Sequence, residues 1–111
     1  MRENFSFNAF AAKTLLADKT GADQTILFSL KSEQTATIIM YTSTWVAGEY
    51  GDVQISHDSG TTWQDLYYEG SQVRLHSTNR AVTVYGAGIF RVDKEATTNA
   101  TGIYLSRDGN L

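Results

Sequence analysis

Apolar and polar residues alternate with a period of two along most of the chain, which is the pattern of half-buried β-strands. In residues 24–31, for example, Ile26, Phe28 and Leu30 share one face. Similar segments are 35–43, 52–57, 62–68, 72–76, 81–85, 89–93 and 102–106. Both faces of 35–43 are partly apolar, as expected for a central strand. Helical periodicity is weak, and residues 11–18 are the best helical candidate.

The breaks between these segments fall at glycines and at Asn or Thr clusters, because the chain has no proline to make its turns. About eight short strands with turns at this spacing predict an all-β fold, a jelly-roll-like β-sandwich of antiparallel strands. The 111 residues are enough for one domain. We assign residues 24–111 to the sandwich.

Residues 1–23 differ from the rest of the chain. They carry Phe5, Phe7 and Phe10 among polar residues. Two interpretations stay open: a first strand that closes the sheet, or an N-terminal arm that packs on a partner. In the second case the three phenylalanines are the docking residues.

Charge and composition narrow the function. The net charge is −3 and the nine Lys and Arg are scattered, so a nucleic-acid partner is not expected. The chain lacks Cys, and its two His lie far apart, which argues against a metal site or a thiol nucleophile. No apolar run is long enough to span a membrane and no signal peptide is visible, so we expect synthesis in a cytoplasm. We expect no catalytic residues and no cofactor.

The sharpest local motif is residues 56–63, Ser-His-Asp-Ser-Gly-Thr-Thr-Trp. It resembles the Asp-box hairpin of sialidases and related propellers. Asp58 is expected to accept hydrogen bonds from turn amides, Gly60 to supply a positive φ, and Trp63 to fold back over the hairpin. A single copy predicts a structural turn, and we carry over no catalytic role.

Aromatic residues are the candidate contacts. Tyr67 and Tyr68 are adjacent in one expected strand, so their side chains point to opposite faces and one of them should leave the core. Exposed aromatics suit either a protein interface or sugar stacking. For sugar stacking, the candidate platforms are Trp45, Tyr50 and Trp63.

Residues 81–106 resemble segments of small virion proteins of tailed phages. The shared features are a Gly-x-Gly turn at Gly86, an aromatic-Arg-Val strand, a Lys-x-Ala-Thr turn at Lys94, and a Gly-aliphatic-Tyr-Leu strand from Gly102. The chain departs from the pattern at Glu95, where a proline is expected. In length and β content the whole chain is similar to capsid decoration proteins, above all the small capsid staple (cement) proteins of short-tailed phages.

The resemblance implies a protein on the outer capsid surface of a virion, made in the host cytoplasm. It implies binding to the major capsid protein as a homo-oligomer, with a dimer favoured over a trimer, and stabilisation of the shell by bridging its subunits. The alternative is a carbohydrate-binding module or a tail or adhesin component that binds a glycan. A small glycosidase is the third and weakest interpretation.

Overall fold

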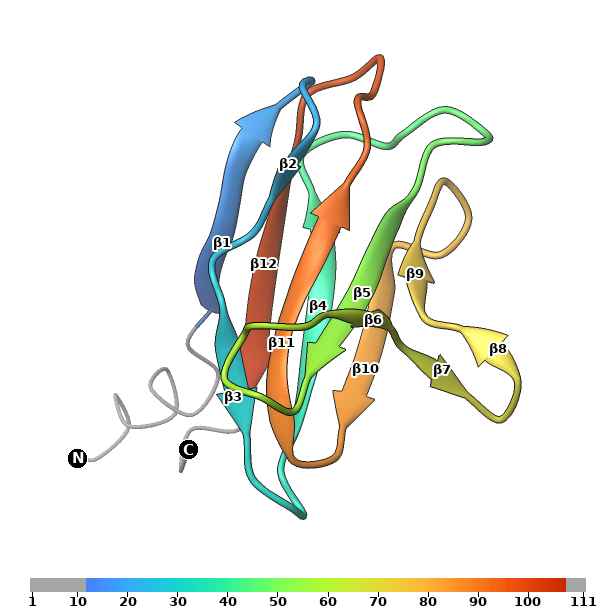
Figure 1. Ribbon diagram of the computed structural model, residues 1–111. Coiled ribbons are helices and arrows are strands. Elements are labelled where there is room, and N and C mark those ends of the chain that lie inside the picture. Colours follow the sequence, from blue (N-terminus) through green and yellow to red (C-terminus); the bar gives the residue numbers. More distant parts are fainter. Residues whose placement is uncertain (1–11, 108–111) are drawn as a thin grey trace, which may run out of the picture.

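The structure, a computed structural model, describes residues 12–107. These residues form twelve strand segments and no helix, and every strand pairing among them is antiparallel. Two sheets face each other across one core (Figure 1). The chain is therefore an all-β protein with the layers of a β-sandwich.

The four-stranded sheet has the order β1–β12–β4–β10. Its strands are β1 (Ala12–Lys19), β12 (Thr101–Arg107), β4 (Thr35–Tyr41) and β10 (Ala81–Tyr85). β4 is central, as its two-sided apolar pattern predicts. Its register sets Ile38 opposite both Val82 and Leu105, so these three side chains lie on the same face of the sheet.

The second sheet has the order β2–β11–β5–β6. Two more short strands pair with its inner strands β11 and β5. Its strands are β2 (Asp23–Gln24), β11 (Gly88–Lys94), β5 (Gly51–Ser56) and β6 (Gln64–Asp65), with β3 (Phe28–Leu30) on β11 and β9 (Arg74–Leu75) on β5. A separate hairpin of β7 (Tyr67–Tyr68) and β8 (Ser71–Gln72) lies beyond β6.

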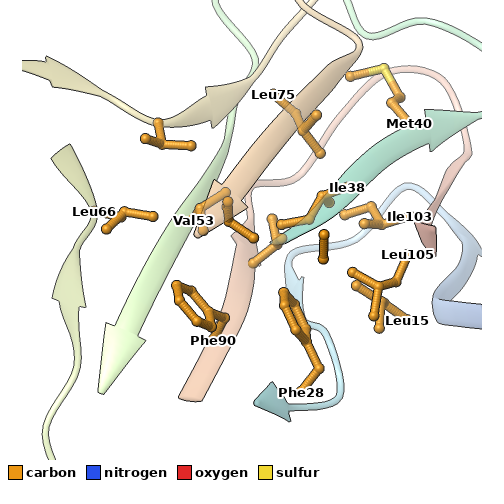
Figure 2. Close-up of a cluster of buried hydrophobic side chains, with 14 of the residues drawn as sticks. Leu15, Phe28, Ile38, Met40, Val53, Leu66, Leu75, Phe90, Ile103 and Leu105 are labelled. Atoms are coloured by element: carbon orange, nitrogen blue, oxygen red, sulfur yellow. The ribbon is translucent and has the colours of Figure 1, made fainter. Parts of the chain in front are cut away.

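The core lies between the two sheets (Figure 2). Alternate residues of β4 and β12 supply one side of it, and β3, β5 and β11 supply the other. Phe28 and Phe90 stack there with ring centroids 5.5 Å apart. The fully buried side chains include Ile38, Val53, Leu75, Val84, Phe90, Val92, Ile103 and Leu105. The period-two pattern of the sequence thus separates core from surface.

Two expectations about the first 31 residues need correction. Residues 12–18 form strand β1 and not a helix, because pairing with β12 outweighs the helix-favouring Ala, Leu and Lys of this segment. A register shift after Thr14 lets Leu15 reach the core. Residues 1–11, with the candidate arm residues Phe5, Phe7 and Phe10, lie outside the described residues.

The expected strand 24–31 is interrupted. Thr25, Ile26 and Leu27 separate β2 from β3, and Ile26 and Leu27 are each 49 % exposed, so the prediction that Ile26 faces the core is wrong. The reason is that Ile26 donates its amide hydrogen to Leu15 of the other sheet, while Thr25 bonds to Val92. Residues 62–68 and 72–76 are likewise interrupted, at Leu66 and Val73, whose side chains turn into the core.

One end of the core is closed by Trp45 and Lys94. Lys94 is only 1 % exposed, and its Nζ donates to the carbonyl oxygens of Gly21 and Glu95. Burial lowers the pKa of this ammonium, which lies 5.8 Å from the Trp45 ring centroid. Trp45 packs tightly on Gly51, where a Cβ atom would lie 2.8 Å from the indole. This end of the sandwich therefore depends on a small residue at position 51.

The alternation along β4 makes a sharp test with one residue type. Ile38→Ala should lower the free energy of unfolding by about 2–5 kcal/mol, because it leaves a cavity in the core. Ile39→Ala, on the outer face of the same strand, should cost about 1 kcal/mol or less, since Ile39 is only half-buried. Urea denaturation measures both. Equal losses would contradict the strand register.

Candidate functional site

The hairpin of residues 57–63 is organised by Ser56 and Asp58. The Ser56 hydroxyl donates to Asp58 Oδ1 at 2.8 Å and accepts the amide hydrogen of Gly60 at 2.9 Å. Asp58 Oδ1 also accepts from the Thr62 amide at 2.8 Å. Gly60 has a φ of 86°, and Trp63 Nε1 donates to the Gly60 carbonyl at 3.0 Å. All of these hydrogen bonds join two residues of the motif, so their polar groups stabilise the turn.

These donors also set the charge state of Asp58. The Thr62 amide and then the Ser56 hydroxyl stabilise the carboxylate, and together they lower the pKa of Asp58 from 3.8 to about 2. Asp58 is therefore an ionised turn acceptor at neutral pH and is unsuited to act as a general acid.

Tyr67 and Tyr68 do point in different directions. Tyr67 is 56 % exposed. Tyr68 packs against the core, and its hydroxyl donates to the Tyr85 carbonyl at 2.6 Å and accepts the Tyr85 amide hydrogen at 2.8 Å. The Tyr68 and Tyr85 rings stack at 4.1 Å. Tyr68 thus fastens the β7–β8 hairpin to β10, whereas Tyr67 and the half-exposed Tyr85 are available for contacts.

The three candidate sugar platforms are all engaged within the protein. Trp45 is buried, so it is excluded as a surface platform, because its loop folds over the end of the core. Arg74 lies over the Tyr50 ring, with its Cζ 4.0 Å from the centroid. Arg91 lies over the Trp63 ring in the same way, at 4.2 Å. The structure does not bring these aromatics together into one stacking surface.

The outer face of the four-stranded sheet carries an uncharged surface. No motif in the sequence marks it, because its residues come from separate strands. Three adjacent strands contribute to it. Its members, placed by register, are Ala81, Thr83 and Tyr85 of β10, Thr35, Thr37, Ile39 and Tyr41 of β4, and Tyr104, Ser106 and the covered Gly102 of β12. We call this the Thr/Tyr face. The sequence signal for it was the absence of charge at the outward positions of β4, which are Thr, Thr, Ile and Tyr.

The geometry of the Thr/Tyr face is regular. The hydroxyls of Thr37 and Thr83 lie 3.3 Å apart across β4 and β10. Tyr41 and Tyr104 meet edge to face with ring centroids 4.8 Å apart, and Tyr41 is half-exposed. The carboxylate of Asp18 lies at the margin, beside Gly102, where it accepts a hydrogen bond from Thr42. The face therefore presents aromatic rings and hydroxyls, with its nearest carboxylate at the edge.

Within residues 12–107 no group of three or more His, Asp or Glu side chains is placed to hold a metal ion. His57 and His76 lie in different parts of the fold, at the Asp58 hairpin and beside Tyr50. No described helix could cross a membrane, because this part of the chain has none.

Comparison with known proteins leaves the family open. No family model, no curated protein and no solved structure matches the chain.

The Asp58 turn predicts a specific acid response. A carboxyl with a lowered pKa in the folded state stabilises it above pH 3.8, and this contribution is lost as the pH falls toward about 2. Asp58→Asn should therefore be less stable than the wild type at pH 6, and the difference should shrink as the pH approaches 2. Urea denaturation at several pH values measures it, with the exposed Glu33→Gln as the control for the lost charge. A difference independent of pH would contradict the role of the ionised carboxylate.

Proposed function

We propose that this protein is a structural subunit of a phage virion that binds the capsid exterior and stabilises the shell by bridging major capsid protein subunits. The observation that carries the proposal is the Thr/Tyr face. This surface is suited to binding another protein. The resemblance of residues 81–106 to virion proteins suggests that the partner is a phage capsid.

The composition of the Thr/Tyr face favours a protein partner. Interface centres are depleted of charged residues and enriched in tyrosine, because desolvating a charge is costly while a tyrosine ring buries area and keeps a polar end. Charged residues make up 19 % of the chain, yet none lies at the ten outward positions of β4, β10 and β12 that form this face. Hydroxyls of Thr and Ser supply adaptable hydrogen bonds beside the rings, as in other recognition surfaces.

The mechanism requires no chemistry. A protein that binds the assembled shell and not its free subunits shifts the assembly equilibrium toward the shell by mass action. Bridging requires two contacts per unit, which a homo-oligomer supplies, and a dimer is the favoured form. Phe5, Phe7 and Phe10 stay predicted docking residues, with the exposed Tyr67 as an additional contact. On this proposal the protein acts outside the capsid, after synthesis in the host cytoplasm.

A charge placed on the Thr/Tyr face tests the proposal. Thr83 is exposed, so Thr83→Lys should fold normally. It should weaken binding to capsids stripped of this protein at least tenfold, since docking would bury an unpaired ammonium group. The readout is co-sedimentation of the purified variant with capsids of the phage that encodes it, across a concentration series.

The matched control is Thr61→Lys, the same substitution at an exposed position of the hairpin next to the other sheet. It should bind the shell like the wild type. Equal binding of Thr83→Lys and wild type would overturn the assignment of the Thr/Tyr face, and absence of saturable binding by the folded wild type would overturn the capsid role. Removal of residues 1–11 tests the three phenylalanines separately.

A further inference from the structure

The outer face of the six-stranded sheet carries a continuous row of polar side chains. Gln24, Arg91, Gln54 and Asp65 follow one another across β2, β11, β5 and β6. Arg91 donates from Nη1 to Gln24 Oε1 at 3.0 Å and from Nε to Gln54 Oε1 at 2.8 Å. Gln54 Nε2 in turn donates to Asp65 Oδ1 at 3.1 Å. The row therefore sets an amide, a guanidinium, a second amide and a carboxylate side by side, one per strand.

Arg91 is held by neutral groups, and the nearest carboxylate on its own strand is that of Asp93, two residues away on the same face of β11. Two amide oxygens orient the guanidinium, and the Trp63 ring supports it from one side at 4.2 Å. Among the described residues it forms no ion pair, unlike Arg74, which pairs with Asp52 at 2.8 Å on the same sheet. The Nη2 atom of Arg91 forms no hydrogen bond with any described residue. A guanidinium fixed by neutral groups presents its remaining N–H donors in a fork that matches a carboxylate.

An apolar hollow lies next to this row. It has a volume of about 230 Å³ and is lined by Leu27, Phe28, Ser29 and Ile89. Ile89 is two residues before Arg91 on β11, so both side chains lie on the same face. Leu27 and Trp63 both approach Gly60, which places the hollow beside the Trp63 support of Arg91. Leu27, half-exposed, leaves this hollow open to solvent.

We propose that this surface, the Arg91 site, binds an acidic sugar. The carboxylate of the sugar would take the free N–H donors of Arg91. Ring hydroxyls would pair with the planar amide and carboxylate groups of Gln24, Gln54 and Asp65, which offer donors and acceptors at the strand spacing of about 4.8 Å. An apolar side of the ring, or an N-acyl methyl group, would fill the hollow at Leu27 and Ile89.

The amides of Gln24 and Gln54 beside Arg91 favour an acidic sugar over an inorganic anion. An inorganic anion would need further cations, and no described Lys or Arg forms part of the row beside Arg91. The carboxylates of Asp65 at one end of the row and of Asp93, opposite Gln24 on the same face, would repel a polyanion but accept hydrogen bonds from hydroxyls. A single carboxylate on a hydroxyl-rich ring therefore fits the arrangement of charge along the row.

The test is titration of the whole ¹⁵N-labelled protein with sialyllactose and with trigalacturonic acid, followed by NMR. At least one of them should shift the side-chain signals of Arg91 Nε–H and of the Gln24 and Gln54 amides, saturably and in the millimolar range or below. Lactose, the neutral control, should bind at least tenfold more weakly. Arg91→Gln should weaken binding of the acidic sugar at least tenfold, and Arg91→Lys should do so as well, because an ammonium lacks the fork.

Arg80→Gln is the matched control, since Arg80 donates to the Met40 and Ser43 carbonyls at the other sheet, and it should bind like the wild type. Absence of saturable shifts, equal binding of lactose, or full binding by folded Arg91→Gln would each overturn the proposal. The result is independent of the capsid role, because Arg91→Gln should still co-sediment with capsids and Thr83→Lys should still bind the sugar.

Discussion

The strict alternation along β4 is the constraint on which the rest of the structure depends. Its inward residues Ala36, Ile38 and Met40 are buried against the other sheet, and its two neighbours continue the same core. The outward residues of the same strand lie outside the core and carry no charge. Because the side-chain period is two, a slip of one residue would exchange these sets and destroy both the core and the Thr/Tyr face. Fold and proposed function therefore rest on one register.

The sequence predicts the strands correctly where the alternation of apolar and polar residues is long. It fails where contacts outside the strand determine the direction of a side chain. Strands β4, β5, β10, β11 and β12 lie where the period-two pattern sets them. The pattern cannot show that Leu15 accepts a hydrogen bond from Ile26, which turns Ile26 outward. It also cannot show that Trp45, in a loop, closes the core on Gly51. Both depend on contacts between residues that do not belong to the same strand, which alternation along one strand cannot report.

The candidate surfaces were less predictable than the strands, for a related reason. Local turn chemistry gives the Asp58 hairpin, since its hydrogen bonds join residues within four positions. The Thr/Tyr face and the Arg91 site are each assembled from several strands, so no short motif marks them. The two faces differ in kind: one offers rings and hydroxyls without charge, and the other holds a guanidinium between amides. On the two proposals, the opposite faces of the sandwich would bind different partners.

A cryo-electron microscopy map of the capsid with this protein bound tests the central claim most directly. The account predicts that the outer face of the four-stranded sheet, with Tyr41, Thr83 and Tyr104, lies against the shell, and that the sheet carrying Arg91 faces solvent. A map in which the Arg91 sheet contacts the shell and the Thr/Tyr face is exposed would contradict it.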